Sequence, residues 1–133
     1  MRQAMKLLLD TCALLWLGSD PDSLSPRAKE ALVQSPDQIH VSAISALEIA
    51  IKVAKGRLVL PAPPESWYPR VLQTYQLREV PVSGTIALRA PRVALVQADP
   101  ADRIVVSTAL ELGLAVITAD HHIRASTEVS VIW

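Results

Sequence analysis

Residues 7–11 read Leu7-Leu8-Leu9-Asp10-Thr11, an apolar triplet that ends at a carboxylate. A short apolar run without alternation is typical of a strand buried on both faces, as in a parallel sheet. In open sheets of this kind, ligands bind beyond the carboxyl ends of the strands. The stretch therefore predicts a buried first strand that carries Asp10 to a ligand-binding edge.

Strands and helices alternate along the rest of the chain. We expect further strands at residues 39–42, 79–82, 114–118 and 129–132. Pro81 in the second of these indicates either a strand end or an edge strand. We expect helices at residues 12–17, 26–33, 45–54, 65–77, 85–95 (interrupted by Pro91) and 100–112. This alternation implies right-handed crossovers. It predicts one domain over residues 1–133, a three-layer α/β/α sandwich with a central, mainly parallel sheet.

The composition excludes several classes of protein. The chain has 133 residues, half of them hydrophobic, which argues against disorder. Cys12 is its single cysteine, so no disulfide scaffold is expected, and a lone thiol fits a reducing cytoplasm. Thirteen basic and thirteen acidic residues cancel, so any nucleic-acid contact needs a local patch. Aromatic residues make up only 4%, which argues against the base-stacking surfaces of single-strand-binding proteins.

The N-terminal segment does not favour a membrane or secretory protein. No apolar run reaches ~18 residues without a charge, so no membrane-spanning helix is expected. Asp10 falls in the middle of what would be the apolar region of a signal peptide. We expect residues 1–4 to be an extension before a natural start at Met5.

Four acidic residues are the candidates for chemistry. Asp10 and Asp120 end predicted strands, and Glu48 and Asp102 stand near predicted helix starts. Each has a purely structural explanation, such as a capping box over residues 45–48 or a helix start capped by Asp99. Helices that follow strands begin at the same edge of the sheet, however, so the four carboxylates should meet there. Oxygen ligands suit Mg²⁺ or Mn²⁺, which can activate water against a phosphodiester.

Four blocks of sequence carry a family resemblance. They are Leu7–Leu17, Val41–Lys52, Asp99–Ala109 and Val116–Asp120. In this order they resemble the motifs of PIN-domain ribonucleases of the VapC toxin type, and together they span essentially the whole chain. The resemblance implies a PIN-like fold and a metal-dependent endoribonuclease, the toxin of a type II toxin–antitoxin pair. It also implies an RNA substrate, structured as tRNA is, together with an antitoxin that covers the site and a homodimer.

The resemblance also assigns roles to residues. It carries over the catalytic and metal-binding acids as Asp10, Glu48, Asp102 and Asp120, and Thr11 and Thr118 as hydroxyls that support them. Apart from the resemblance, Lys52 and Arg103 are candidate RNA contacts beside these acids. Lys52, together with Lys55 and Arg57, is more typical of a solvated helix end that the helix dipole favours. The chain departs from the subgroup's frequent pattern at Cys12, at Ala101 and at residues 96–98, where His, an aromatic residue and a His are common. None of these is one of the four acids, so the departures concern substrate fit and the rim of the site.

Two other functions compete with this hypothesis. An aspartyl-phosphate phosphatase also has a nucleophile after strand one, but its chemistry wants a second acid two residues later, where this chain has Cys12. A non-catalytic PIN-like module that binds RNA or protein is the second alternative.

Several other residues have a structural explanation. We expect His121 and His122 to be surface-loop residues, because adjacent positions rarely point at one ion. Trp16 and Trp67 are expected in the core or in a partner groove, and Cys12 as a small packed side chain.

Overall fold

The computed structural model of the protein describes residues 5–95 and 98–133. Its five strands are β1 (Leu7–Leu9), β2 (Ile39–Ser42), β3 (Arg78–Val80), β4 (Ala115–Ile117) and β5 (Val131–Ile132). They form one sheet in the order β3-β2-β1-β4-β5, and every pair is parallel. The predicted parallel sheet is confirmed, and β3, which Pro81 follows, is an edge strand. Residues 1–4, expected to be an extension, and residues 96 and 97, which belong to a departure from the family pattern, lie outside the described residues.

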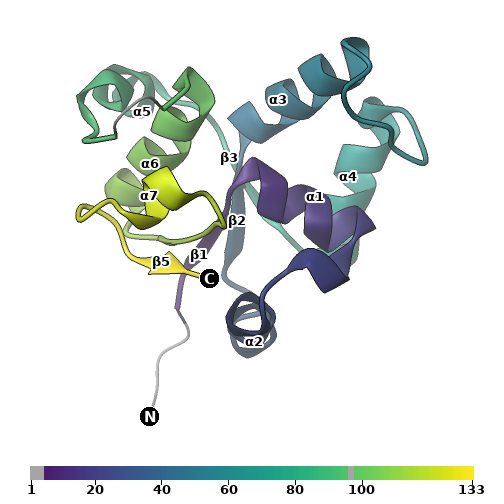
Figure 1. Ribbon diagram of the computed structural model, residues 1–133, viewed down its shortest axis with the longest axis horizontal. Helices are drawn as coiled ribbons and strands as arrows, with labels where there is room; N and C mark the ends of the chain where they lie inside the picture. The colour runs from purple at the N-terminus through teal and green to yellow at the C-terminus, as the bar shows by residue number, and fades with distance from the viewer. Residues whose placement is uncertain (1–4, 96–97) are drawn as a thin grey trace.

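Helices cover both faces of this sheet (Figure 1). They are α1 (Thr11–Ser19), α2 (Pro26–Gln34), α3 (Ala43–Ala54), α4 (Pro64–Tyr75), α5 (Gly84–Arg89), α6 (Pro100–Leu112) and α7 (His121–Arg124), with 3-10 turns at Pro21–Ser23 and Ala90–Arg92. Side chains of α1 to α4 join one buried cluster, and those of α6 and α7 join the other. The predicted three-layer α/β/α sandwich is confirmed.

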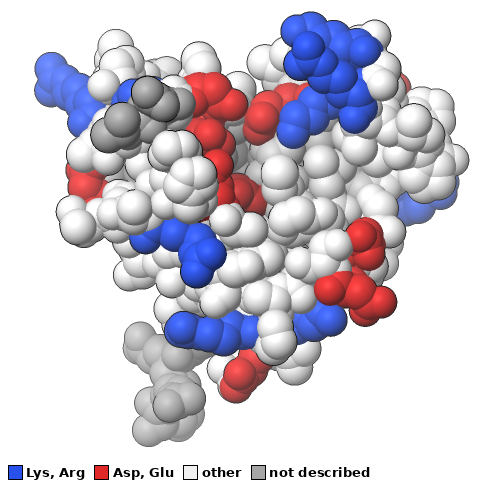
Figure 2. Space-filling model, in the orientation of Figure 1, with Lys and Arg blue, Asp and Glu red and all other residues white. Residues whose placement is uncertain are grey.

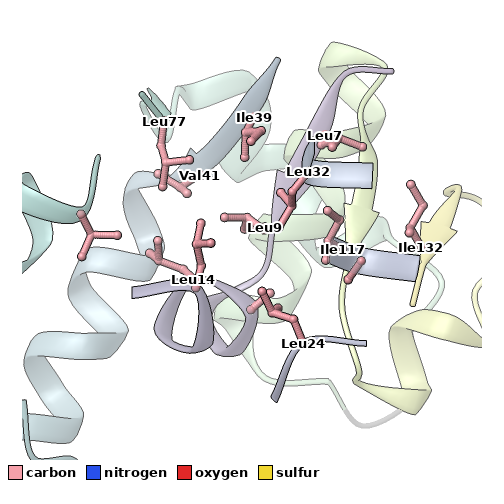
Figure 3. Close-up of a cluster of buried hydrophobic side chains, with 14 of the residues drawn as sticks. Leu7, Leu9, Leu14, Leu24, Leu32, Ile39, Val41, Leu77, Ile117 and Ile132 are labelled. Carbon is pink, nitrogen blue, oxygen red and sulfur yellow. The ribbon is translucent and has the colours of Figure 1, made fainter. Parts of the chain in front are cut away.

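The side chains of β1 divide between these two clusters. Leu7 and Leu9 point to the face covered by α1 to α4, and Leu8 points to the face covered by α6 and α7. All three are fully buried, as the unbroken apolar run predicts. Figure 3 shows the first cluster, in which Leu9 lies among Leu14 of α1 and Ile117 of β4. The chain has no Phe, and the core is aliphatic apart from Trp67.

The order of the strands places a ligand site between β1 and β4. From β1 the chain builds outward through β2 and β3, and then returns to the other side of β1 to form β4 and β5. The connections after β1 and β4 therefore leave the sheet in different directions and open a crevice. The backbone N–H of Asp10 donates to the carbonyl of Ile117 at 3.1 Å and holds the two strand ends together.

Two local expectations were wrong. Helix α3 begins at Ala43 and is capped by Ser42, whose hydroxyl accepts from the N–H of Ile44. The expected capping box over residues 45–48 therefore does not exist, and Glu48 lies in the second turn of α3. His121 and His122 belong to the short helix α7 instead of a loop, because the carboxylate of Asp120 caps its first turn.

Candidate active site

Asp10 is the buried centre of the site. One of its carboxylate oxygens accepts from the N–H of Ala13 at 2.8 Å and so caps α1, and the other accepts from the hydroxyl of Thr118. Only 6% of the residue is exposed. Burial raises the pKa of its carboxyl above the ordinary value, and the nearby charges of Asp120 and Glu48 raise it further, against the opposing effect of the two hydrogen bonds.

Glu48 is held by the hydroxyl of Thr11, at the start of α1, which also contacts a serine hydroxyl of α3. The hydroxyl of Thr11 donates to its Oε1 at 2.5 Å, and the hydroxyl of Ser45 lies 2.8 Å from that of Thr11. Ser45 is fully buried. Ser45 and Glu48 are three residues apart on α3 and share a face of the helix. Ser45 was not predicted as a site residue, because the sequence pattern assigned its hydroxyl to a helix cap. With Ser42 recognised as the cap, the Ser45 hydroxyl would have been free for a role in the site.

Asp102 stands in the first turn of α6. Its N–H donates at 2.8 Å to Asp99, which caps the helix as predicted. Partial burial raises the pKa of Asp102 to about 7, and the charges of Asp99, Asp120, Glu48 and Asp10 contribute in that order. Asp102 is therefore close enough to acids of three other segments of the chain to be influenced by their charge.

Thr118 connects Asp10 to Asp120. Besides donating to Asp10, its hydroxyl oxygen accepts from the N–H of Asp120 at 3.0 Å. One oxygen of Asp120 accepts from the N–H groups of His122 and Ile123, at 2.8 and 3.2 Å. Thr118 is fully buried, so these bonds fix the segment that follows β4 against the segment that follows β1.

All four predicted acids line one small pocket, with a volume of about 250 Å³. The other lining residues are Thr11, Cys12, Trp16 and Ala119. Figure 2 shows acidic side chains gathered in the hollow between α6 and α3. The expectation that Cys12 is packed was wrong, because the residue is exposed at this pocket. Its thiol is still partly shielded from solvent, and this partial burial and the charge of Asp10 raise the pKa of the thiol, which disfavours a thiolate nucleophile.

The carboxylate oxygens of the pocket are the kind of ligand that a hard divalent cation prefers, but they do not form a complete coordination shell. Within residues 5–95 and 98–133, no three Asp, Glu, His or Cys side chains lie close enough to surround an ion. The two ion pairs found there, Lys29–Asp22 and Arg89–Glu111, lie outside the site. Burial and neighbouring carboxylates raise the pKa values of Asp10 and Asp102, and neither of these ion pairs offsets the acidic charge of the site. A Mg²⁺-like ion would relieve this situation.

The two candidate RNA contacts differ. Lys52 follows Glu48 by one turn of α3, and its charge lowers the pKa of Cys12, so it lies near the pocket. In Figure 2 basic side chains gather over the C-terminal half of α3, beside the acidic hollow. The guanidinium of Arg103 instead donates to the carbonyls of Val93 and Leu95, at 3.0 and 2.8 Å. Arg103 therefore has a structural task, and its contact with RNA stays a prediction.

The chain resembles known proteins both in sequence and in fold. A family model for the PIN domain matches residues 7–127. Ribonuclease VapC22 of Mycobacterium tuberculosis is 33% identical over 122 residues, which cover 90% of each chain. Among solved structures, the DNA-bound VapBC of Salmonella typhimurium matches with a TM-score of 0.70 at 16% identity over 96% of both chains. The toxin VapC20 of Mycobacterium tuberculosis matches with a TM-score of 0.64 at 18% identity over 93% of this chain and 98% of that one. In the described part of this chain, no helix is long and apolar enough to cross a membrane.

Proposed function

Because the chain belongs to the PIN-domain family, we propose that it is a metal-dependent endoribonuclease, the toxin of a type II toxin–antitoxin pair. The observation that carries the proposal is the pocket beyond the ends of β1 and β4, which is lined by the carboxylates of Asp10, Glu48, Asp102 and Asp120. The relative at 33% identity is a ribonuclease by name, which supports RNA as the substrate.

Mg²⁺ or Mn²⁺ would be held by Asp10, Glu48 and Asp102, with Asp120 completing the site. When bound, such an ion lowers the pKa of water and stabilises the charge that develops on a phosphodiester. The hydroxyls of Thr118 and Thr11 keep the carboxylates of Asp10 and Glu48 in fixed orientations. The acidic pocket by itself repels the RNA backbone, so productive binding requires the cation.

The proposal includes a substrate and partners. We expect a structured RNA such as tRNA, with Lys52 contacting a backbone phosphate beside the pocket and Arg103 as a second candidate contact. Structural neighbours are described as toxin–antitoxin complexes, which supports an antitoxin that covers this site. Leu47 and Ile51 are exposed four residues apart on α3, a face suited to the proposed homodimer. A cytoplasmic location agrees with the free thiol of Cys12.

The function is tested by incubating the purified, antitoxin-free protein with total tRNA in Mg²⁺, Mn²⁺ or EDTA. We expect discrete fragments with either metal and none with EDTA. Hydrolysis by water leaves no 2′,3′-cyclic phosphate on the fragments, whereas a metal-free contaminant that uses the ribose hydroxyl as nucleophile does. A folded protein that binds metal and RNA but cuts no RNA of any kind would be a binding module, and the enzyme proposal would be wrong.

A further inference from the structure

Two of the three tryptophans of the chain pack against each other, and one of them lines the acidic pocket. Trp16 is on α1, six residues after Asp10, and lines the pocket. The ring of Trp133, which follows β5, lies 5.5 Å from that of Trp16, with the ring planes tilted by 42°.

This pair differs from an ordinary core aromatic. Trp67, the third tryptophan, is 4% exposed, and its ring extends from α4 to Gly18 of α1 within the core. Trp16 and Trp133 are only partly buried and pack against the outside of the same cluster. One side of Trp16 is therefore supported by the core and by Trp133, and part of its ring is available in the pocket. Such a ring is held in place before any ligand arrives, which lowers the entropic cost of stacking on it.

The pocket combines this ring with the carboxylates within about 250 Å³. That volume is below the ~300–1,000 Å³ of typical small-molecule sites, so it suits a fragment of a polymer. A phosphodiester placed at the carboxylates carries a ribose and a base on each side, and one of these bases is then near Trp16. Stacking on an aromatic face does not depend on charge, and so it can attract RNA to a pocket whose carboxylates repel phosphate.

We propose that Trp16 is a stacking platform for the base beside the cleaved bond, and that Trp133 supports its ring. The inference rests on the proposed nuclease function and makes it more specific. A base that stacks on a side chain has to leave its own helix, so the cleaved bond lies at an unpaired nucleotide of the structured RNA. The low aromatic content of the whole chain is compatible with this, because one platform serves one nucleotide.

The test is a cycle that combines protein and RNA changes. An RNA oligonucleotide that the wild type cuts is compared with the same RNA lacking the base on one or the other side of the cut. Trp16→Met keeps an adaptable apolar side chain against the core but removes the aromatic face. Trp16→Phe keeps the face, and Trp67→Phe is the matched control away from the pocket. For each protein, kcat/KM and the quenching of tryptophan fluorescence by RNA are measured.

We expect Trp16→Met to lower kcat/KM about tenfold or more, and Trp16→Phe to restore most of it. Removing the stacked base should cost the wild type a similar factor and cost Trp16→Met almost nothing, because the two changes remove the same interaction. Trp133→Met, which leaves Trp16 in place, should cause a smaller loss. This variant keeps the test open if Trp16→Met does not fold.

Other outcomes separate the inference from the function on which it rests. Equal losses on base removal in the wild type and in Trp16→Met would overturn the platform and leave the nuclease intact. Normal cleavage by Trp16→Met together with lost inhibition by a cognate antitoxin would assign the pair to a protein partner instead. If the wild type cuts no RNA, the proposed function fails, and the platform fails with it.

Discussion

Among single residues, Asp102 is the acid whose pKa is raised most clearly by burial and by its neighbours. Partial burial and four nearby carboxylates raise its pKa to about 7, and burial also raises the pKa of Asp10. A site that holds such carboxylates together without a cation is destabilised by their mutual repulsion. Removing one of these charges should therefore raise the stability of the metal-free protein.

Asp102→Asn should raise the melting temperature of the metal-free protein at pH 8. The folded state holds the proton of Asp102 up to about pH 7, whereas the unfolded state releases it near the ordinary value of 3.8. The folded state thus binds more protons between these values, and its stability falls as the pH rises from about 4 to 7. The difference in melting temperature between wild type and Asp102→Asn, followed in EDTA from pH 4 to 8, should grow over this range.

Asp37→Asn is the matched control, because Asp37 is exposed in a turn and lies outside the pocket. It should leave the pH profile unchanged. Added Mn²⁺ should stabilise the wild type and the control but not Asp102→Asn. A lower melting temperature for Asp102→Asn at pH 8 in EDTA would contradict the account of repulsion.

Thr11→Val should weaken metal binding without removing a carboxylate. The change deletes the O–H that donates to Glu48 and that lies beside Ser45, and it keeps the shape of the side chain. Loss of a supporting hydrogen bond behind a metal ligand typically lowers affinity about 10- to 100-fold. Calorimetric titration with Mn²⁺ measures this, and Thr11→Ser, which retains the hydroxyl, should restore the affinity. Unchanged affinity in Thr11→Val would mean that Glu48 needs no support.

At the scale of elements, the packing of α1 on α4 depends on a glycine. A Cβ on Gly18 would come within 2.6 Å of a ring carbon of Trp67 and 2.9 Å of a methyl of Val71. Helix α1 carries Asp10 at its N-cap, as well as Thr11 and Trp16. The close approach at Gly18 therefore sets the position of the helix that contributes most to the site.

Gly18→Ala should destabilise the protein by roughly 1–3 kcal/mol, the usual cost of overpacking a core. This loss exceeds the gain of at most about 1 kcal/mol from a better helix former. Denaturant unfolding measures it. Gly84→Ala, at the start of α5 with open space around it, is the control and should be neutral or slightly stabilising. Equal stabilisation by both changes would mean that α1 can move away from α4 without cost.

Arg103 ties the chain before α6 to the helix. Its guanidinium donates to the carbonyls of Val93 and Leu95, and lysine cannot reproduce that fork. Arg103→Lys should lower the free energy of unfolding by about 1.5–3 kcal/mol, as expected for hydrogen bonds to a charged group. If stability is unchanged while RNA affinity falls, Arg103 acts on RNA and not on the fold.

The sequence predicted the elements well where local chemistry decides them. Asp99, Pro100 and Gly113 mark the ends of α6, and the structure confirms all three signals. The prediction failed at α3, because Ser42 and Ser45 are both plausible caps and only the tertiary contact of Ser45 with Thr11 separates them. The pairing of Trp16 with Trp133 could not be predicted either, since it joins residues that are far apart in the chain.

At the scale of the whole molecule, zero net charge conceals a separation of charge. Acidic side chains gather in the hollow between α6 and α3, and basic ones gather over the end of α3 (Figure 2). The family resemblance predicted the four acids as site residues, and they line one pocket. The strand order explains its position, because the connections after β1 and β4 leave the sheet in different directions. Sequence alone could order the motifs along the chain but could not place the pocket between particular helices.

Lys52→Gln should weaken RNA binding in a salt-dependent way. If Lys52 contacts one phosphate, its loss should reduce the slope of log affinity against log salt concentration by about 0.7, the value for one contact on single-stranded nucleic acid. Binding titrations at several salt concentrations measure the slope. Lys29→Gln is the control, because Lys29 pairs with Asp22 on the surface and does not line the pocket. Equal slopes for wild type and Lys52→Gln would exclude the contact.

We propose that the carboxylates lining the pocket beyond β1 and β4 hold the metal ion that makes this chain a nuclease. The most direct measurement titrates one preparation with Mn²⁺, following heat of binding and the rate of RNA cleavage in parallel, for the wild type and for Asp10→Asn. We predict that cleavage by the wild type rises with metal occupancy and disappears in EDTA. Asp10→Asn should remain folded and lose both signals. Cleavage at the full rate by Asp10→Asn, or by the wild type without metal, would contradict the account.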